Sequence, residues 1–439
     1  MASINQNKKT DHVTHEGAPA KRINAELELR RSVMACMLWE DTFYENGEAI
    51  AERINGLIAK VEPQKVSQIA IEAREKMKLR HAPLLIVREM ARLPQHKALV
   101  SKTLERVIQR ADELTEFLAI YWKDKRQPLS AQVKKGLAKA FPKFNAYDLA
   151  KYNRDGAIKL RDVLFLTKPK SKDEAQTETW KKLVNKTLES PDTWEVELSS
   201  GKDKKLTWER LLSEKKLGPL ALLRNLRNMK EAGVTQSLIF QSLEEMKVER
   251  VLPFRFISAA RYAPQWEPQL EKAMFKCLAS MEKLPGKTAI VVDNSGSMVG
   301  ASVSARSEID RSDAACALAI LVREICEDCV VIAFSDRPTL IPARRGFALR
   351  DAIKKSPSGS TMTESAIQMA KNEGYDRIIV ITDEQSHQVI GGPDKKGYFI
   401  NVATNQNGIG YGKWLHIDGW SETIIDYIRE IERENEFQK

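Results

Sequence analysis

The fold is decided by one stretch, Thr288-Ala-Ile-Val-Val-Asp293-Asn-Ser295-Gly-Ser297-Met298. Four apolar residues follow Thr288, three of them β-branched, and the run ends at Asp293 in a polar turn that contains a glycine. This pattern predicts a buried parallel strand that leads into a loop. Asp293, Ser295 and Ser297 alternate along the loop, so a carboxylate and two hydroxyls can face a common point, and Gly296 permits a tight path between them. Three hard oxygen groups suit Mg²⁺, and Mn²⁺ or Ca²⁺ also fit.

The loop resembles the metal-ion-dependent adhesion site (MIDAS) of von Willebrand factor A (vWA) domains, whose D-x-S-x-S sequence is completed by a Thr on a second loop and an Asp after a later strand. Thr361 lies in Ser358–Thr363, just before an amphipathic helix, and Asp383 follows the apolar run Arg377–Thr382. The resemblance therefore implies that Thr361 and Asp383 are the fourth and fifth metal ligands. A D-x-S-x-S string alone is common in turns, so the order of all five residues carries the prediction. A purely structural ion is the alternative.

Length and composition describe a globular protein of two or three domains, since the chain has 439 residues, of which 42% are hydrophobic and 30% charged. Residues 1–22 lack the apolar segment of a secretory signal, and no later run reaches the length of a membrane span. We therefore expect a cytoplasmic protein without a membrane partner. Five scattered cysteines do not form a disulfide framework in a chain of this length, and the Cys326–Cys329 pair has no second pair to complete a zinc site.

Charge is distributed unevenly along the chain, which the net value of +10 does not show. Residues 284–439 contain 18 Lys and Arg against 22 Asp and Glu, a net charge of −4, which leaves 52 against 38 and a net charge of +14 in the remainder. A basic domain joined to a slightly acidic one favours a polyanionic partner for the first, most often nucleic acid. An ordinary lysine-rich solvated surface is the alternative.

We expect residues 1–20 to form a flexible leader, and helical patterns fill the chain after it. Ten or more amphipathic helices are expected before residue 284, including one over Leu99–Trp122, and a strand pattern occurs only at Trp194–Leu198. No fixed repeat period is apparent, so periodicity leaves an irregular bundle and an array of helix pairs both open.

Strands and helices alternate after the linker Leu284–Lys287. Strands are expected at 288–292, 329–334, 377–382, 397–402 and 414–417, and helices at 307–325, 348–355, 363–372 and 421–434. A largely parallel sheet with helices on both faces holds ligands at the carboxyl ends of its strands, and Asp293 and Asp383 are both expected at such ends.

Three further segments, at 150–169, 217–229 and 251–262, resemble the TROVE module of the Ro autoantigen family, here of a bacterial or phage type. They contain Lys151-Tyr-Asn-Arg154, Leu222-Leu-Arg-Asn-Leu-Arg227 and Pro253-Phe-Arg-Phe256. That family joins a ring of HEAT-like helical repeats to a vWA domain. The resemblance thus implies an α plus α/β fold, with a helical-repeat RNA-binding ring at 21–284 and a doubly wound vWA domain at 285–439.

RNA contacts are expected from basic residues near the first of these segments, together with one aromatic residue. The candidates are Lys151, Tyr152, Arg154, Lys159, Arg161 and Lys168. Lys and Arg gain affinity from phosphate contacts through counterion release, and a tyrosine can stack on an unpaired base. The resemblance implies that this segment binds structured Y-like RNA, while the ring accepts single-stranded ends of misfolded RNA. A His stands at the position of Lys168 in animal Ro proteins. A second basic group, Arg224, Arg227, Arg255 and Arg261, either lines the ring or pairs with carboxylates.

Catalysis is not expected. The sequence has no G-x-S-x-G elbow, and His387 is the only histidine near a predicted site loop. Two carboxylates and three hydroxyls leave a bound ion strongly electrophilic, which suits the binding of an acidic protein ligand. We expect a monomeric Ro-like scaffold for RNA quality control that presents RNA to an exoribonuclease. The alternatives are a protein-interaction scaffold without an RNA role, a metal-dependent hydrolase, and an accessory subunit of a chelatase-type ATPase whose phosphate loop lies on another chain.

Overall fold

The computed structural model describes residues 24–35, 47–77, 79–153, 156–199, 201–248, 251, 253–279, 281–300, 309–386, 388–403, 412–418, 424–425, 428–429 and 432. They belong to two compact units. The helical unit comprises Ala25–Leu38 and Glu48–Thr207, and the mixed unit comprises Trp208–Lys439 with two short segments from before Glu48. The change from helices to alternating strands and helices comes later, at Leu284. The mixed unit therefore contains helices from both sides of residue 284.

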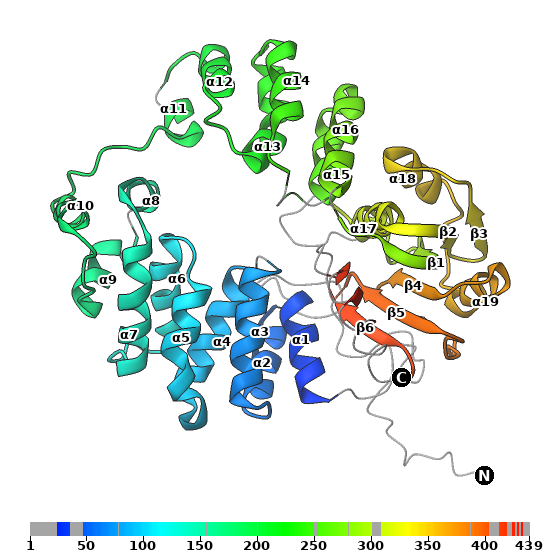
Figure 1. Cartoon of the computed structure of the whole chain (residues 1–439), viewed down its shortest axis with the longest axis horizontal. Coiled ribbons are helices and arrows are strands. Elements are labelled where there is room, and N and C mark those ends of the chain that lie inside the picture. The colour runs from blue at the N-terminus through cyan, green and yellow to red at the C-terminus, as the bar shows by residue number, and fades with distance from the viewer. Residues whose placement is uncertain are drawn as a thin grey trace, which may run out of the picture. The chain divides into compact units, whose positions relative to one another are not determined.

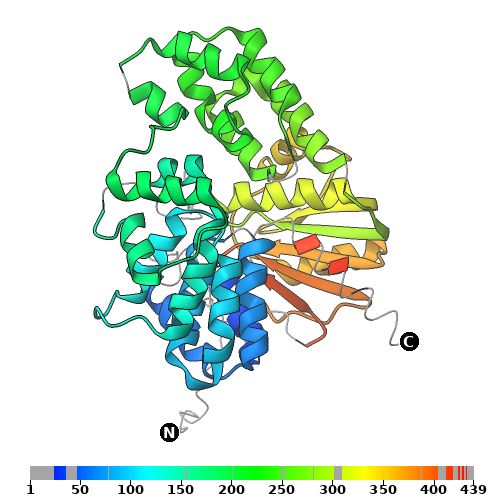
Figure 2. The same ribbon diagram turned by 60° about the vertical axis from the view of Figure 1, so that its left-hand side comes forward.

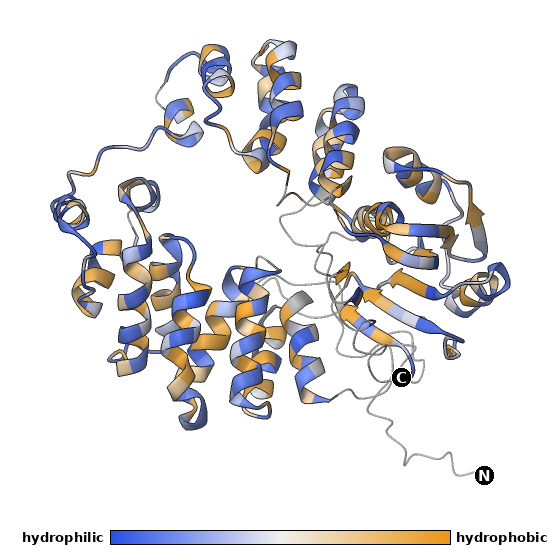
Figure 3. Cartoon of the chain, viewed as in Figure 1, coloured by the Kyte–Doolittle hydropathy of each residue, from blue (hydrophilic) through white to orange (hydrophobic). Residues whose placement is uncertain are grey.

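The helical unit is built from α-helices, most of which pack against the next helix or the next but one along the chain (Figure 1). Their bounds are α1 Ala25–Ala35, α2 Gly47–Ile58, α3 Pro63–Glu75, α4 His81–Arg92, α5 Lys97–Val107, α6 Asp112–Tyr121, α7 Ala131–Ala140, α8 Ala146–Tyr152, α9 Leu160–Thr167, α10 Glu174–Asn185 and α11 Trp194–Ser199. Figure 3 shows apolar and polar stripes along single helices, as expected when each helix buries one face.

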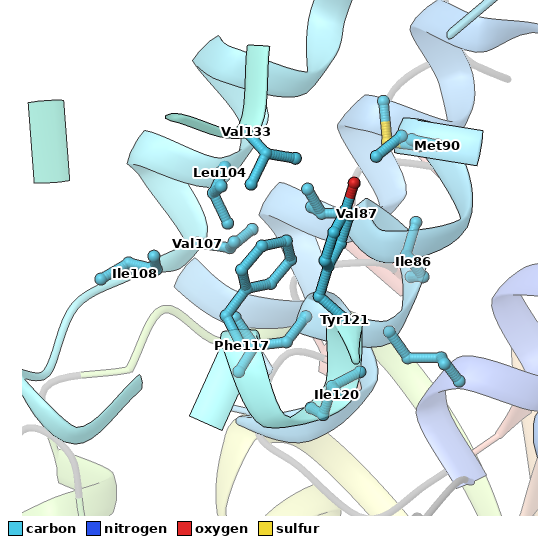
Figure 4. Close-up of a cluster of buried hydrophobic side chains, with 14 of the residues drawn as sticks. Ile86, Val87, Met90, Leu104, Val107, Ile108, Phe117, Ile120, Tyr121 and Val133 are labelled. Carbon is cyan, nitrogen blue, oxygen red and sulfur yellow. The ribbon is translucent and has the colours of Figure 1, made fainter. Parts of the chain in front are cut away.

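The core of the helical unit runs continuously between these helices. Figure 4 shows Val87 of α4, Leu104 of α5, Phe117 of α6 and Val133 of α7 directed toward one another, and all four side chains are fully buried. Burial of one such side chain stabilises a protein by about 1.5–3 kcal/mol. This packing also supports α8 and α9, whose Leu149, Leu160 and Val163 belong to the same core.

The single helix expected over Leu99–Trp122 is wrong, because the chain breaks after Val107 and restarts at Asp112. The fully buried Glu113 makes the break. Its carboxylate accepts hydrogen bonds from the backbone N–H groups of Gln109, at 2.8 Å, and Arg110, at 3.0 Å. It also pairs with Arg74 of α3 at 2.7 Å. A distant partner, rather than a local Gly or Pro, therefore ends α5.

The strand pattern at Trp194–Leu198 also proved wrong, since this segment forms α11. Thr193 lies just before the helix, and its hydroxyl oxygen accepts the Val196 N–H at 3.4 Å. A Thr in this position satisfies a backbone donor that a helix start leaves free.

The mixed unit continues with α12 Lys204–Ser213, which spans the division between the units, then α13 Pro219–Glu231, α14 Gln236–Glu245, α15 Pro253–Tyr262 and α16 Glu267–Ala279. A six-stranded sheet follows, in the order β3-β2-β1-β4-β5-β6. Its strands are β1 Leu284–Asp293, β2 Cys326–Phe334, β3 Pro338–Ile341, β4 Arg377–Thr382, β5 Lys396–Asn401 and β6 Leu415–Asp418.

The sheet is parallel except at its edge, where β3 runs antiparallel to β2. β3 has no counterpart among the predicted strands. The expected linker Leu284–Lys287 is the first part of β1, where Leu284 pairs with Cys326 before an irregularity in register. The parallel sheet itself agrees with the prediction.

Three helices complete the α/β region, α17 Arg311–Ile325, α18 Gly346–Lys354 and α19 Thr363–Glu373. α19 packs with Ala289 and Val291 of β1, whereas α17 runs along the sheet beneath α15 and α18 (Figure 2). Almost every residue of α17 is buried, including Cys316. Asp310 caps this helix by accepting the Asp313 N–H at 2.7 Å. Residues 301–308 and most of the expected final helix at 421–434 lie outside the described residues.

Candidate functional site

The predicted metal ligands lie where the connectivity of the sheet changes direction. From β1 the chain proceeds to β2 on one side, while β4 occupies the other side, and β1 and β4 run parallel with Val292 opposite Ile381. Asp293 and Asp383 therefore follow neighbouring strands at the same edge, and both are buried. Such a switch point is the usual ligand position in an open α/β sheet.

Asp293 is held by its own loop and by the end of β4. One carboxylate oxygen accepts the Ser295 N–H at 2.8 Å, and the other accepts the Thr382 hydroxyl at 2.6 Å. Burial and the charge of Asp383 raise the pKa of Asp293 to about 7, outweighing these hydrogen bonds. A cation between the two carboxylates would relieve their repulsion. Thr382 was not among the predicted site residues, although its position before Asp383 at a strand end was readable.

The two serines lie together on the first loop. The Ser295 and Ser297 hydroxyl oxygens are 3.2 Å apart, and the Met298 N–H donates to the Ser295 carbonyl at 3.0 Å. Gly296 does not have a positive φ, and a Cβ there would lie 3.5 Å from the Gly359 carbonyl oxygen, an ordinary contact. Gly296 therefore permits this path, but the path does not require a glycine at residue 296.

The loop that contains Thr361 is fastened to the other loops through its backbone. The Gly359 carbonyl accepts the Gly296 N–H at 2.8 Å, and the Met362 N–H donates to the Ser335 carbonyl at 2.9 Å. The Ser386 hydroxyl, which follows Asp383, donates to the Thr361 carbonyl at 3.3 Å. The structure thus brings together the three loops that carry Asp293, Ser295, Ser297, Thr361 and Asp383.

The donor set fits a hard divalent cation. Two carboxylates and up to three hydroxyls are oxygen ligands of the kind that Mg²⁺ accepts. Within the described part of the chain, no three His, Cys, Asp or Glu side chains gather as a softer or more anionic metal site. Burial raises the pKa of the Cys326 thiol to about 11, which disfavours a thiolate ligand there.

Arg311, the first residue of α17, also contacts these loops. Sequence analysis did not identify it as a site residue. Its Nη1 atom lies 3.5 Å from the Asp383 carboxylate and donates to the Ser297 carbonyl at 3.3 Å. The side chain is 2% exposed. A permanent cation therefore contacts two of the three ligand loops. A basic residue at a helix start gives no sequence signal for such a contact.

The predicted RNA-contact residues that the structure describes lie on α8, on α9 and directly before and after α9. Lys151 is half-buried, with its ammonium 5.8 Å from the ring centroids of both Tyr147 and Tyr152. Tyr152 packs against the helical core, and the Arg110 guanidinium lies 4.7 Å from its ring centroid. Because Tyr152 is already engaged in this way, the 48%-exposed Tyr147 is better placed to stack on a base.

The remaining candidates surround α9. Lys159 precedes the helix, and its N–H donates to the Asp162 carboxylate at 2.8 Å. The Arg161 Nε atom lies 3.9 Å from an Asp162 carboxylate oxygen, and both side chains are partly exposed. Lys168 ends the helix in a left-handed conformation, with a φ of 49°, and is exposed. Arg154 lies outside the described residues, as does His387.

Sequence reasoning missed two exposed aromatic residues on these helices. Phe165 of α9 is 58% exposed, and Tyr147 lies one helical turn before Lys151. The spacing of Tyr147 and Lys151 is the signal that could have revealed the pair. We call Tyr147, Lys151, Tyr152, Lys159, Arg161, Phe165 and Lys168 the α8–α9 surface.

Two members of the second basic group, Arg261 and Arg227, make structural contacts with other side chains. Arg261 pairs with the buried Asp313 of α17, and Arg227 lies 5.1 Å from the ring centroid of Tyr262. Burial and the neighbouring Arg224 lower the pKa of Arg255.

His96 of the helical unit is fully buried. It lies in a short 3₁₀ turn between α4 and α5. Burial lowers the pKa of its imidazole. It therefore belongs to the core of the helical unit.

Together the described helices and strands define a helical-repeat region joined to an α/β domain with a largely parallel sheet. The model of the TROVE domain family matches residues 17–190 and 185–315, well over half of the chain. The chain therefore belongs to the TROVE family.

A solved structure and two curated proteins are also similar to parts or all of this chain. The crystal structure of the Deinococcus radiodurans RO (RSR) protein is similar in fold, with a TM-score of 0.59 and 17% identity over 92% of this chain and 98% of that chain. Telomerase protein component 1 is 38% identical over 89 residues in Mus musculus and 35% identical over 89 residues in Rattus norvegicus. These matches span 19% of this chain and only 3% of each relative. None of the described helices is both long and apolar enough to cross a bilayer.

Proposed function

We propose that this protein binds small structured noncoding RNA, of the Y-like kind, through the α8–α9 surface. The observation that carries the proposal is the combination of Lys151 and Lys168 with the exposed rings of Tyr147 and Phe165. Ammonium groups bind phosphates by counterion release, and aromatic rings stack on unpaired bases. Membership of the TROVE family supports the choice of RNA over other polyanions.

We also propose that the bound RNA is presented, with its single-stranded 3′ end, to an exoribonuclease in RNA quality control or processing. The protein acts as a scaffold and catalyses no reaction. The five scattered cysteines suit a reducing compartment, so we assign the protein to the cytoplasm. We also propose that it is a monomer.

A divalent ion, Mg²⁺ in the first instance, would be held by Asp293, Ser295, Ser297, Thr361 and Asp383. When bound, the ion supplies an electrophilic position for the acidic side chain of a protein ligand. This chain's own residues hold the three loops together through backbone hydrogen bonds, as between Gly296 and Gly359. Two carboxylates with three hydroxyls favour binding over hydrolysis, which usually employs more anionic or imidazole ligands.

The test is a salt titration of RNA binding. The nuclease-treated protein is titrated with a structured small RNA that has a single-stranded 3′ tail, against unstructured RNA as competitor. A triple variant, Lys151→Ala, Arg154→Ala and Lys168→Ala, should weaken binding and reduce the slope of log affinity against log salt by up to about 3, about 1 for each lost phosphate contact.

A matched triple variant, Lys60→Ala, Lys97→Ala and Lys102→Ala, removes the same charge from exposed positions of the same unit. It should retain most of the affinity. Equal losses in the two triple variants would mean that general basicity binds RNA without a defined surface. Weak binding without a salt slope would reject the RNA proposal in favour of protein ligands. Mg²⁺-dependent cleavage that is lost in Asp293→Ala would make the protein a hydrolase.

A further inference from the structure

The guanidinium of Arg311 lies among the groups that we propose as metal ligands. Its Nη1 atom contacts the Asp383 carboxylate at 3.5 Å and the Ser297 carbonyl at 3.3 Å, so one cationic nitrogen joins the end of β4 to the first loop. The Arg311 and Asp383 side chains are 2% and 0% exposed, so water screens their interaction little.

The backbone fixes Arg311 in this place. It is the first residue of α17, whose start is capped by Asp310. The next residue, Ser312, donates its N–H to the Met298 carbonyl at 3.0 Å, which ties the helix to the first loop. On another side of the helix start, Asp313 is held by Arg261 of α15 and Lys354 of α18. Arg311 is therefore held against Asp383 by contacts on either side of it.

The charge of the site follows from these contacts. A guanidinium is protonated at every pH that a folded protein meets. With both carboxylates ionised, Asp293, Asp383 and Arg311 together carry a charge of about −1, and a bound divalent ion changes this to about +1. Without Arg311 the same ion would leave the site neutral.

We propose that Arg311 is a positioning and charge-setting residue that weakens cation binding on its own and makes it depend on an anionic co-ligand. The inference rests on the proposed metal site. In the absence of the ion, the guanidinium offsets the two buried carboxylates and bridges their loops. When the ion is bound, the remaining positive charge favours the binding of a further carboxylate. A partner's acidic side chain therefore binds together with the ion.

The experiment measures Mn²⁺ binding to the full chain, by electron paramagnetic resonance of the free ion, with and without acetate as a monocarboxylate probe. Wild type, Arg311→Met and Arg311→Lys are compared. Arg311→Met should bind Mn²⁺ alone about tenfold tighter or more, because a buried like charge has been removed. It should also lose the increase in affinity that acetate gives to the wild type. Arg311→Lys keeps the charge and should resemble the wild type.

Several outcomes would overturn the inference. One is a folded Arg311→Met that binds Mn²⁺ with unchanged or lower affinity, and another is an acetate effect of equal size in wild type and Arg311→Met. If Arg311→Met does not fold without the ion, Mn²⁺ should restore its circular dichroism spectrum, and failure to restore it counts against the inference. If neither the wild type nor Arg311→Met binds Mn²⁺, the metal site itself is refuted, which is a separate result.

Discussion

Gly359 is the residue on which the geometry of the second loop depends. Its carbonyl accepts the Gly296 N–H, and a Cβ at this position would overlap the carboxylate of Asp336. That carboxylate in turn accepts the Ser360 N–H at 2.6 Å. A side chain at residue 359 therefore displaces Asp336 and releases the backbone next to Thr361.

Gly359→Ala should weaken Mn²⁺ binding by about tenfold, because groups that orient metal ligands typically affect affinity to that extent. Gly296→Ala is the matched control, since its Cβ would make only an ordinary contact with the Gly359 carbonyl. Calorimetric titration of both variants with Mn²⁺ measures the difference. Equal affinities would show that the Asp336 contact does not position Thr361.

The site residues also differ in whether the sequence alone could identify them. Asp293, Ser295 and Ser297 could be chosen because one loop contains all three. Arg311 could not, because only the folded position of α17 brings a helix-start arginine to Asp383. Tyr152 was chosen as the interleaved aromatic residue, but the structure packs it on the core and leaves Tyr147 exposed. Burial of one tyrosine in place of the other depends on tertiary packing.

At the scale of elements, β4 is anchored by an ion pair at its first residue. The Arg377 guanidinium makes a bidentate contact with the Glu432 carboxylate, and its third nitrogen donates to the Pro285 carbonyl and the Thr288 hydroxyl, both at 3.1 Å. Arg377 is 1% exposed and Glu432 8%. Burial acts to raise the pKa of Glu432, but Arg377 and Lys396 outweigh it and the pKa is lowered.

Glu432→Gln should lower the free energy of unfolding by about 3 kcal/mol at pH 7, because it leaves a buried arginine without its charged partner. A lowered carboxyl pKa stabilises the fold above the unfolded pKa, about 4.3 for Glu, and this contribution is lost as pH falls through the folded value. The difference between wild type and variant in denaturant unfolding should therefore shrink below about pH 4.

Glu373→Gln, at an exposed position on α19, is the control for Glu432→Gln and should change stability by less than about 0.5 kcal/mol. A similar small effect for Glu432→Gln would mean that the Arg377 contacts to backbone and Thr288 suffice to hold β4.

Elements were predictable where their pattern is local. The runs of Ile and Val that form β1 and β4 identify buried parallel strands without ambiguity. β3 is four residues long, begins with Pro338 and lies at an edge, so its pattern is weak. The break between α5 and α6 contains neither Gly nor Pro, and it depends on Arg74, nearly 40 residues earlier. Long-range partners of this kind are not visible in a single sequence.

At the scale of the whole molecule, the proposed metal site and the α8–α9 surface belong to different compact units. Asp293→Ala should abolish Mn²⁺ binding while RNA affinity stays within about threefold of the wild type, because phosphate contacts dominate that affinity. The checks are Mn²⁺ titration and fluorescence anisotropy of labelled RNA on the same preparation, with Asp293→Asn as an isosteric companion. A large loss of RNA affinity in a folded variant would refute this separation.

The broad architecture was readable from the chain because two independent signals agree. The helix-rich basic part and the acidic alternating part each carry a family-like motif, and the TROVE assignment confirms the family. The compact units divide at Thr207, although the pattern of elements changes at Leu284. Helices α13–α16 follow the helical pattern in sequence yet pack within the mixed unit, a choice made by tertiary contacts that periodicity does not encode.

The burial of Cys316 within α17 gives the protein an intrinsic chemical reporter. Burial raises the pKa of this thiol to about 12, so the reactive thiolate is scarce and sealed from reagents while the helix stays on the sheet. Alkylation at Cys316 must therefore wait until α17 detaches, and its rate, followed by mass spectrometry of the peptide, records that local opening. Arg311 begins the same helix, so the alkylation rate of Cys316 can be compared with and without the metal ion. The effect of ion occupancy on helix opening can thus be followed on the unlabelled protein.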